Sequence, residues 1–507
     1  MRGRALPPGP RGLPIIGNLL DTPQSKAWYG YRELSLIYGD VVYLQVMGRH
    51  VVVLGSPNSI SEFLEKRTAN TSDRLVTPLV RLTGIDWILG LIPYGPVWRA
   101  YRRALWQHFH PGVLPKYLPV QRAITRKFLL KLLQKPENFK QHVRFVLAAT
   151  ILKIAYGIDV DDENHEVIRM IDAALEAPAQ AFVPGKFLVD VFPLLQYVPT
   201  WFPGAGFQNV FARWREASLR MKENLFKMRN TAFTEDVVLG DTTIVDALWL
   251  RYSNGVPGQS LNVKDLIEDV AAVTFEAGSD TTFSTVVATF VALSLYPEVQ
   301  KKAQAELDGV VGRGRLPELN DREALIYVKA VIMESLRWHN VTPLGIAHRT
   351  MVDDEIQGYF IPAGTILVAN IWACMHDSAE YPDPADFYPE RFIRDGKIDA
   401  SVRDPFTVAF GSGRRHVLVE ILYAMVSEYR DTLLQRICPG RYFAKDSLFL
   451  IIASVLHMFS ITPPVDDHGQ PVKVEPIMSD GFLSYLEDCR CTIRPRFLEV
   501  ELLRLLA

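Results

Sequence analysis

Apolar residues recur at helical spacing over most of the chain, and a smaller part alternates apolar and polar residues. Helical spacing dominates from about residue 97 to 340. Its longest stretch runs without a proline from residue 263 to 296, behind the capping residue Asn262. Residues 40–54 alternate around a Met-Gly-Arg turn, which predicts a β-hairpin. After residue 343 short strands and Pro/Gly turns take over. The pattern predicts a mainly α fold with a small β portion (α+β) around a long central helix.

Shorter elements carry recognisable boundary residues. Ser56-Pro57 predicts a helix start, because serine caps a helix and proline suits its first position. A second helix is expected from about Leu325 to Trp338, after a capping Asn320 or Asp321. Another apolar helix follows Pro439-Gly440. No flexible linker separates these parts, so we expect a single domain over residues 1–507 that begins with a Pro-rich segment, residues 1–27.

Composition narrows the function classes. The chain has 507 residues, is 48% hydrophobic, and balances 55 Lys+Arg against 57 Asp+Glu, for a net charge of −2. That balance excludes a basic nucleic-acid binder, and 11% aromatic residues exclude intrinsic disorder. Four cysteines cannot build a disulfide framework in a chain of this length, which fits a reducing compartment.

Membrane signals are mixed. The N-terminus has no apolar core segment, so the sequence as written predicts no signal peptide. Residues Phe187 to Phe207 mix Phe, Leu, Val and Trp with three prolines, and the prolines exclude one long helix. This stretch is either a packed irregular connection or an apolar surface that enters a membrane or shapes a ligand entrance.

The central helix contains a polar motif in an apolar neighbourhood, residues Ala277 to Thr282. Gly278 weakens the helix, and Thr281 can compete for a backbone carbonyl. An acid, Asp280, beside a hydroxyl and a weakened turn indicates a proton relay next to a bound ligand. The alternative is a kink with a solvated aspartate.

Two further pairs are weaker signals. Glu334 and Arg337 share one helical face, where a surface ion pair is the usual explanation. Trp98 and Arg102 lie one turn apart and could hold one anionic group from two sides. A tryptophan at the edge of the core with a solvated arginine explains that spacing equally well.

The strongest local signal lies in two pieces. Residues 410–415 form a glycine-rich turn that ends in two cations, and Ile437-Cys438-Pro439-Gly440-Arg441 opens a helix. A cysteine at a helix N-terminus near cations has its thiolate favoured, and such a sulfur is suited to bind a metal or haem iron.

Taken in order along the chain, these motifs resemble those of the cytochromes P450, haem-thiolate monooxygenases, of the eukaryotic microsomal and fungal-like type. The resemblance runs from about Pro7 to Pro495. It is carried by Pro7-Pro8-Gly9-Pro10, Trp98 with Arg102, Ala277-Gly278 with Asp280-Thr281-Thr282, Glu334 with Arg337, Pro389-Glu390-Arg391-Phe392, and the cysteine loop.

The resemblance implies a role for each matching residue. Cys438 would be the axial thiolate of haem b, and Asp280 and Thr281 would deliver the protons that oxygen cleavage requires. The positions that would contact the cofactor are Trp98, Arg102, Ala277, His348, Phe410, Arg415, Cys438 and Gly440. Among these, Trp98, Arg102, His348 and Arg415 would hold the propionates, although His348 could equally be an ordinary buried histidine. Glu334, Arg337 and Arg391 would form a buried structural triad in which removing one member strands the others.

The cysteine loop departs from the family pattern, in which cysteine follows phenylalanine by seven positions. Here Cys438 follows Phe410 by 28 positions (410 to 438), and deleting the 21 residues 416–436 restores the pattern. We interpret this insertion as a retained intron or a mis-drawn gene model. Loop closure costs little, only about 0.6 kcal/mol per doubling of length. The turn no longer leads directly to the sulfur, however, and we therefore expect impaired or absent haem binding.

The implied reaction inserts one atom of O2 into a lipophilic molecule, such as a terpenoid, polyketide, fatty or aromatic compound. Electrons would come from an NADPH-dependent cytochrome reductase. The implied location is the cytosolic face of the endoplasmic reticulum membrane, although the usual apolar anchor is absent and only Arg2 and Arg4 remain of its basic patch. The chain is either truncated there or held at the membrane surface through residues 187–207. The alternatives are an inert product without competent haem, caused by residues 416–436, and a plain haem sensor.

Overall fold

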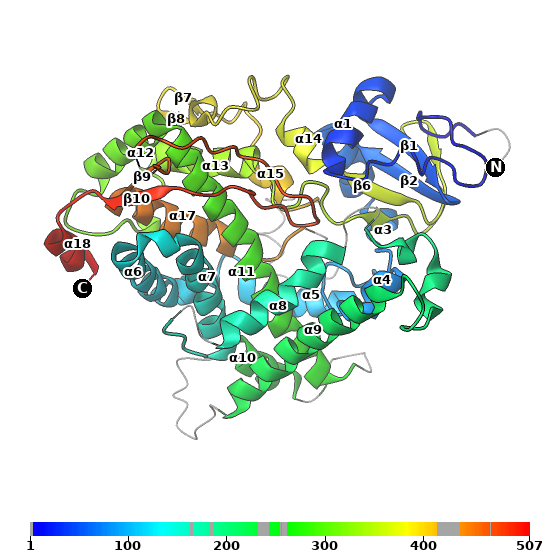
Figure 1. Ribbon diagram of the computed structural model, residues 1–507, viewed down its shortest axis with the longest axis horizontal. Helices are drawn as coiled ribbons and strands as arrows, with labels where there is room; N and C mark the ends of the chain where they lie inside the picture. Colours follow the sequence, from blue (N-terminus) through cyan, green and yellow to red (C-terminus); the bar gives the residue numbers. More distant parts are fainter. Residues whose placement is uncertain are drawn as a thin grey trace.

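Figure 1 shows a computed structural model in which a large helical part adjoins a smaller part built on strands. The structure describes residues 4–162, 166–181, 186–231, 243–253, 255, 261–412, 437–466 and 468–506. Arg415 and the segment 416–436 lie outside the described residues. The mainly α fold with a small β portion is confirmed.

The helices account for most of the described chain. The α-helices are α1 (Ala27–Tyr38), α2 (Pro57–Ile60), α3 (Thr68–Thr71), α4 (Pro78–Leu82), α5 (Pro96–Phe109), α6 (Leu118–Gln134), α7 (Phe139–Tyr156), α8 (Glu166–Ala181), α9 (Gly206–Thr231), α10 (Ile244–Tyr252), α11 (Val263–Leu295), α12 (Pro297–Val310), α13 (Ile326–Trp338), α14 (Ile371–Met375), α15 (Phe406–Ala409), α17 (Arg441–Met458) and α18 (Glu499–Leu506). The shorter helical turns are η1 (Ser61–Glu65), η2 (Leu114–Tyr117), η3 (Pro136–Asn138), η4 (Leu188–Asp190), η5 (Pro193–Tyr197), η6 (Leu319–Asp321) and η7 (Pro389–Phe392).

The strands form one larger sheet and three pairs. They are β1 (Val41–Val46), β2 (Arg49–Leu54), β3 (His348–Arg349), β4 (Asp354–Ile356), β5 (Tyr359–Ile361), β6 (Ile366–Ala369), β7 (Ile393–Arg394), β8 (Lys397–Ile398), β9 (Phe459–Thr462) and β10 (Thr492–Pro495). The four-stranded sheet has the order β1-β2-β6-β3, in which β2 and β6 run parallel and the other neighbours antiparallel. The pairs are β4–β5, β7–β8 and β9–β10.

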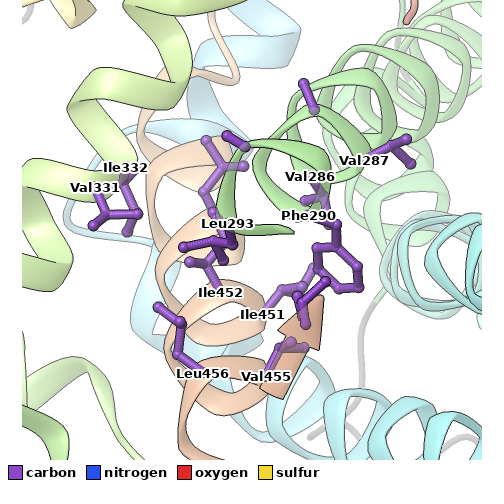
Figure 2. Close-up of a cluster of buried hydrophobic side chains, with 14 of the residues drawn as sticks. Val286, Val287, Phe290, Leu293, Val331, Ile332, Ile451, Ile452, Val455 and Leu456 are labelled. Atoms are coloured by element: carbon purple, nitrogen blue, oxygen red, sulfur yellow. The ribbon is translucent and has the colours of Figure 1, made fainter. Parts of the chain in front are cut away.

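The long helix α11 crosses the middle of the helical part (Figure 1). Its predicted cap is confirmed, since the Asn262 side chain accepts a hydrogen bond from the Lys264 backbone N–H at 3.0 Å. The helix ends two residues before Pro297, as expected from the restriction that a proline places on its predecessor. Figure 2 shows why α11 is apolar in its second half: Val286 and Phe290 face side chains of α17, among them Ile451 and Val455.

The predicted β-hairpin is confirmed as β1 and β2. Its two turn residues, Met47 and Gly48, both have positive φ angles, 49° and 80°, which suits the twist of a tight hairpin. The Pro-rich N-terminal segment lies against β1, because the Tyr43 N–H donates to the Pro8 carbonyl at 2.8 Å. A Cβ on Gly9 would come 1.9 Å from the Tyr43 carbonyl oxygen, so this contact requires glycine.

The helix expected from about Leu325 to Trp338 is confirmed as α13, but its predicted capping residue is wrong. Helix α13 begins at Ile326 with Leu325 as a cap that makes no side-chain hydrogen bond, instead of after a capping Asn320 or Asp321. Those two residues belong to the short turn η6, where the Asp321 carboxylate accepts the Glu318 N–H at 2.8 Å. Asp321 therefore caps the turn η6, which precedes α13, and does not cap α13 itself.

Residues 187–207 form no single long helix, as the prolines predicted. They contain η4 and η5 before α9 begins at Gly206. Several large apolar side chains in this stretch are exposed: Leu194 by 80%, Tyr197 by 76% and Trp201 by 78%. Of the helices that the structure describes, none is by itself both long and apolar enough to span a bilayer, and α11 with α12 meets that standard only as a pair bent by 105°.

Candidate active site

The centre of α11 is open on one side. Residues 266–276 and 279–280 are buried, whereas Ala277 between them is exposed. The Thr281 hydroxyl donates to the Ala277 carbonyl at 2.8 Å, which is the backbone competition predicted for this threonine. The motif therefore presents a small side chain and a hydroxyl at the one place where the middle of this helix is accessible.

Asp280 is held by two donors from distant parts of the chain. It is 1% exposed, and its Oδ1 lies 2.6 Å from Nη1 of Arg144 on α7. The Tyr485 hydroxyl donates to its Oδ2. The Arg144 guanidinium also lies 4.1 Å from the centre of the Phe283 ring. The alternative of a solvated aspartate at a kink is therefore wrong, because this carboxylate is buried and paired.

A second acid of α11, Glu276, lies one turn before Asp280. It is 7% exposed, and its Oε2 makes no hydrogen bond to the described residues. Burial and then the Asp280 charge raise the pKa of Glu276 to about 8. Two of the buried carboxyls of this helix, Asp280 and Glu276, thus have opposite surroundings, since the first is paired and the second has no hydrogen-bond partner among the described residues.

Cys438 stands at the start of α17, as predicted. Gly440 caps that helix, and the backbone N–H groups of Gly440 and Arg441 act on the Cys438 sulfur to lower the pKa of its thiol. Arg102 and Arg441 lower it further, but burial is the largest effect and raises the pKa above the ordinary value. The helix terminus and the cations thus act in the expected direction, and burial outweighs them in the free thiol. Coordination to a metal deprotonates such a thiol outright.

The two ends of the interrupted loop lie together. The Cys438 N–H donates to the Phe410 carbonyl at 2.9 Å, although 28 positions separate the two residues (410 to 438). The Phe410 ring stacks on Phe406 with centroids 5.6 Å apart. The Phe410 backbone therefore lies beside Cys438, whereas the expectation that the glycine turn no longer leads directly to the sulfur concerns a segment that continues outside the described residues. Arg415, whose distance from the Cys438 sulfur we expected to change, lies outside the described residues.

Helix α5 places Trp98 and Arg102 on one buried face. Trp98 is 1% exposed and Arg102 is 3% exposed, so the alternative of a solvated arginine is wrong. The Nε of Arg102 finds no hydrogen-bond acceptor among the described residues. Burial lowers the pKa of Arg102 to about 10, while the charge of Cys438 raises it. Among the described residues, this buried arginine beside Cys438 therefore has one donor, Nε, without an acceptor.

His348 lies on β3 at the edge of the four-stranded sheet. Its Nδ1 is 2.8 Å from the Thr71 carbonyl, and because a carbonyl only accepts, Nδ1 carries the proton. The ring is therefore oriented by backbone, which is compatible with both the propionate role and the role of an ordinary buried histidine.

The three residues of the expected triad meet in the interior. Arg337 donates to both Glu334 carboxylate oxygens at 2.7 and 2.8 Å, and Arg391 donates to Glu334 at 3.2 Å. Glu334 and Arg337 are 0% exposed, which excludes a surface ion pair. The remaining guanidinium donors bind backbone carbonyls of residues 375–386, including Met375 at 3.1 Å and Pro384 at 2.8 Å. The cluster fastens an irregular segment to α13.

Comparison with known proteins decides the family. The family model of cytochrome P450 matches residues 7–416. The cytochrome P450 monooxygenases COX1 and COX2 of Coprinopsis cinerea are each 37% identical to this chain, over 93% and 98% of it and over 88% and 90% of their own lengths. The tryptamine 4-monooxygenase of Psilocybe cyanescens is 34% identical over 99% of this chain and 95% of its own. The chain belongs to the cytochrome P450 family.

As a cytochrome P450 with monooxygenase relatives over nearly its whole length, the protein is an oxidoreductase that incorporates oxygen. The match to the family model ends at residue 416, where the predicted insertion begins. That coincidence agrees with the interpretation that residues 416–436 are foreign to the family pattern.

Haem is the cofactor that a cytochrome P450 carries, and the described residues fit it. Cys438 offers a sulfur at a helix N-terminus, the buried Arg102 has a donor without an acceptor among the described residues, and Ala277 is an exposed small residue in the middle of α11. Cys438 would hold the iron, and Arg102 with Trp98 would hold a propionate. When bound, the haem supplies the activation of O2.

Sequence reasoning missed three residues of this site. Arg144 and Tyr485 hold Asp280, and Glu276 precedes the motif. For Arg144 a signal was available, because it is a single cation inside an apolar helical run. Glu276 gave the same kind of signal, as an acid amid apolar residues of the central helix. Tyr485 gave none, since it reaches the site from the irregular C-terminal part of the chain.

Proposed function

We propose that this cytochrome P450 inserts one atom of O2 into a lipophilic small molecule, with electrons from an NADPH-dependent reductase. The observation that carries this proposal is the Cys438 loop. Its sulfur stands at the start of α17, next to a buried arginine with an unused donor, and its backbone is tied to Phe410 despite the insertion. A thiolate in that position is what haem-dependent oxygen insertion requires.

The proton relay is proposed for Thr281 and Asp280. Thr281 stands at the open part of α11, and its hydroxyl is oriented by the Ala277 carbonyl. Asp280, held by Arg144 and Tyr485, lies one residue away. An oriented hydroxyl beside a fixed carboxylate can pass a proton toward the open side of the helix. The same pair supports a monooxygenase over a plain haem sensor, which needs no proton delivery.

The reductase is proposed to dock on the face formed by α13, α15 and α17. A hollow of about 640 Å³ lies there, and Lys329 and Lys445 stand among its lining residues. Phe406 also lines it, and this residue stacks on Phe410 of the cysteine loop. Electrons entering through this face would have a short path to the sulfur. The hollow is lined by three cations (Lys329, Arg403 and Lys445) and three acids (Glu380, Asp399 and Asp404), so its charges are balanced.

Association with the cytosolic face of the endoplasmic reticulum membrane is proposed through residues 187–207. Leu194, Tyr197 and Trp201 expose most of their surface there, and Trp and Tyr are side chains that favour the membrane–water interface. A lipophilic substrate would reach the enzyme from the same phase.

A second candidate is a folded but inert product without competent haem. The end of the family match at residue 416 favours it, because the interruption falls inside the haem loop. Transcript sequencing addresses its origin: uniform presence of the codons for residues 416–436 in abundant message would contradict a retained intron.

The reduced, CO-bound absorption spectrum tests both candidates. The full chain, the same chain lacking His416 to Arg436, and Cys438→Ser in each background would be compared. The sequence pattern led us to expect impaired or absent haem binding, but because Cys438 stays bonded to Phe410 we propose that the full chain gives a thiolate-type Soret band that Cys438→Ser abolishes. A band in the shortened chain alone would support the inert product, and a band that survives Cys438→Ser in both would refute the assignment of the ligand.

A further inference from the structure

One buried acid of α11, Glu276, has neither a role in the mechanism proposed above nor a cation beside it among the described residues, whereas Glu268 and Asp269 lie beside Lys264 and Lys222. Glu276 is 7% exposed, its Oε2 has no hydrogen-bond partner among the described residues, and it lies next to Ala277, where the helix surface opens. Buried polar groups are normally paired, and an unpaired carboxyl is among the rarest exceptions. Such a group beside an open surface is placed to receive a donor from a ligand.

The neighbouring carboxyl shows what Glu276 lacks. Asp280 receives a guanidinium from Arg144 at 2.6 Å and a hydroxyl from Tyr485. In the part of the chain that the structure describes, the charge that acts on Glu276 is that of Asp280, and no cation opposes it. The positive charge of Arg144 is already engaged by Asp280.

The balance of charge identifies the missing partner. Among the described residues the Arg144 guanidinium pairs with Asp280, so Glu276 has no balancing positive charge when it is ionised. A neutral hydroxyl would satisfy a hydrogen bond but leave this deficit, whereas a cation removes it. Buried charges persist when they are paired with an opposite charge.

We propose that Glu276 binds the protonated amine of the substrate, and that it selects amine-bearing lipophilic molecules. This inference rests on the proposed function, since it places the substrate at the open side of α11. On binding, Glu276 would release the proton that it holds at neutral pH and accept a hydrogen bond from the amine as a carboxylate. The apolar remainder of the molecule would lie on the open side of α11, beside the place of the haem at Ala277.

The test compares two ligands of similar shape. N,N-dimethyl-2-(naphthalen-2-yl)ethylamine carries a cation, and methyl 2-(naphthalen-2-yl)ethyl ether does not. Their affinities for the full chain would be measured by isothermal titration calorimetry at neutral pH, with wild type, Glu276→Gln and Glu276→Asp. The tertiary amine is chosen because its methyl groups hinder direct coordination to iron. Glu268→Gln is the matched control, because Glu268 is a buried acid of the same helix that lies 3.5 Å from Lys264.

We expect wild type to bind the amine at least tenfold more tightly than the ether. Glu276→Gln should weaken amine binding by about 10- to 100-fold, the usual range for losing a hydrogen bond to a charged group, and change ether binding by less than about twofold. Glu276→Asp should keep part of the preference, and Glu268→Gln all of it. Equal amine affinity in wild type and Glu276→Gln would overturn the proposal, and so would equal affinity of wild type for amine and ether.

Failure of the proposed function is recognised separately. The reduced CO-bound spectrum of the same preparations reports the haem thiolate independently of either ligand. A normal spectrum with no amine preference would refute the role of Glu276 and leave the monooxygenase proposal standing.

Discussion

Replacing Glu276 by glutamine should stabilise the folded protein increasingly as pH rises. The native pKa of Glu276 is raised from 4.5 to about 8, mainly by burial and then by Asp280. Between these two values the native state holds a proton that the unfolded chain releases, so the stability of wild type falls as pH increases. Glutamine does not titrate and does not suffer this loss.

The magnitude follows from the size of the pKa change. At about 1.4 kcal/mol per pKa unit, the full shift corresponds to about 5 kcal/mol of destabilisation above pH 8 and to about 2 kcal/mol near pH 6. Below about pH 4.5 both states hold the proton and the effect disappears. The advantage of Glu276→Gln over wild type should therefore grow by about 3 kcal/mol between pH 6 and pH 8.5.

Urea unfolding followed by tryptophan fluorescence at several pH values measures this difference. Glu276→Leu serves as a second variant, because its pH dependence relative to wild type should match that of Glu276→Gln whatever its own packing effect. A stability difference that stays constant from pH 6 to pH 8.5 would refute the reasoning. A Glu276→Gln protein less stable than wild type at the higher pH would do so as well.

Three further changes have expected outcomes. Glu334→Gln leaves two buried guanidinium groups without their carboxylate and should destabilise the fold by about 3–5 kcal/mol, measured by urea unfolding; a loss under 1 kcal/mol would contradict the triad. Gly17→Ala brings a Cβ to 1.8 Å from the Gln45 carbonyl oxygen at a φ of +61°, whereas the Cβ of Gly48→Ala meets open space. In thermal unfolding, only Gly17→Ala should therefore destabilise the fold by more than the backbone strain of about 1 kcal/mol that a positive φ costs either variant. Trp201→Ser should reduce co-flotation with lipid vesicles several-fold, and unchanged flotation would argue against this membrane surface.

Sequence patterns predicted the elements whose causes are local. The β1–β2 hairpin, the Ser56 cap and the proline-bounded helix α11 depend on residues within a few positions of one another. The start of α13 was predicted to within one residue, but its cap was assigned wrongly, because Asp321 caps the preceding turn η6 instead. Which turn the chain uses depends on tertiary packing of the following apolar residues, and that information is not local.

The same limit applies to the site. The roles of Asp280, Cys438 and the Glu334 cluster could be expected from spacing and from family resemblance, but their partners could not. Arg144 reaches Asp280 across 136 positions and Tyr485 across 205. Phe410 stays bonded to Cys438 despite the insertion, because a long loop adds little free energy to a contact that the surrounding packing already favours.

The Glu334 cluster has a consequence for how the protein moves. Residues 376–388 contain no long helix or strand, and a reader of the secondary structure would expect a pliable, protease-sensitive coil. Their carbonyl groups are nevertheless bound by two guanidinium groups that are themselves locked to a buried helix. In hydrogen exchange and limited proteolysis this coil should therefore open together with α13, as one cooperative unit, and not as an independent loop.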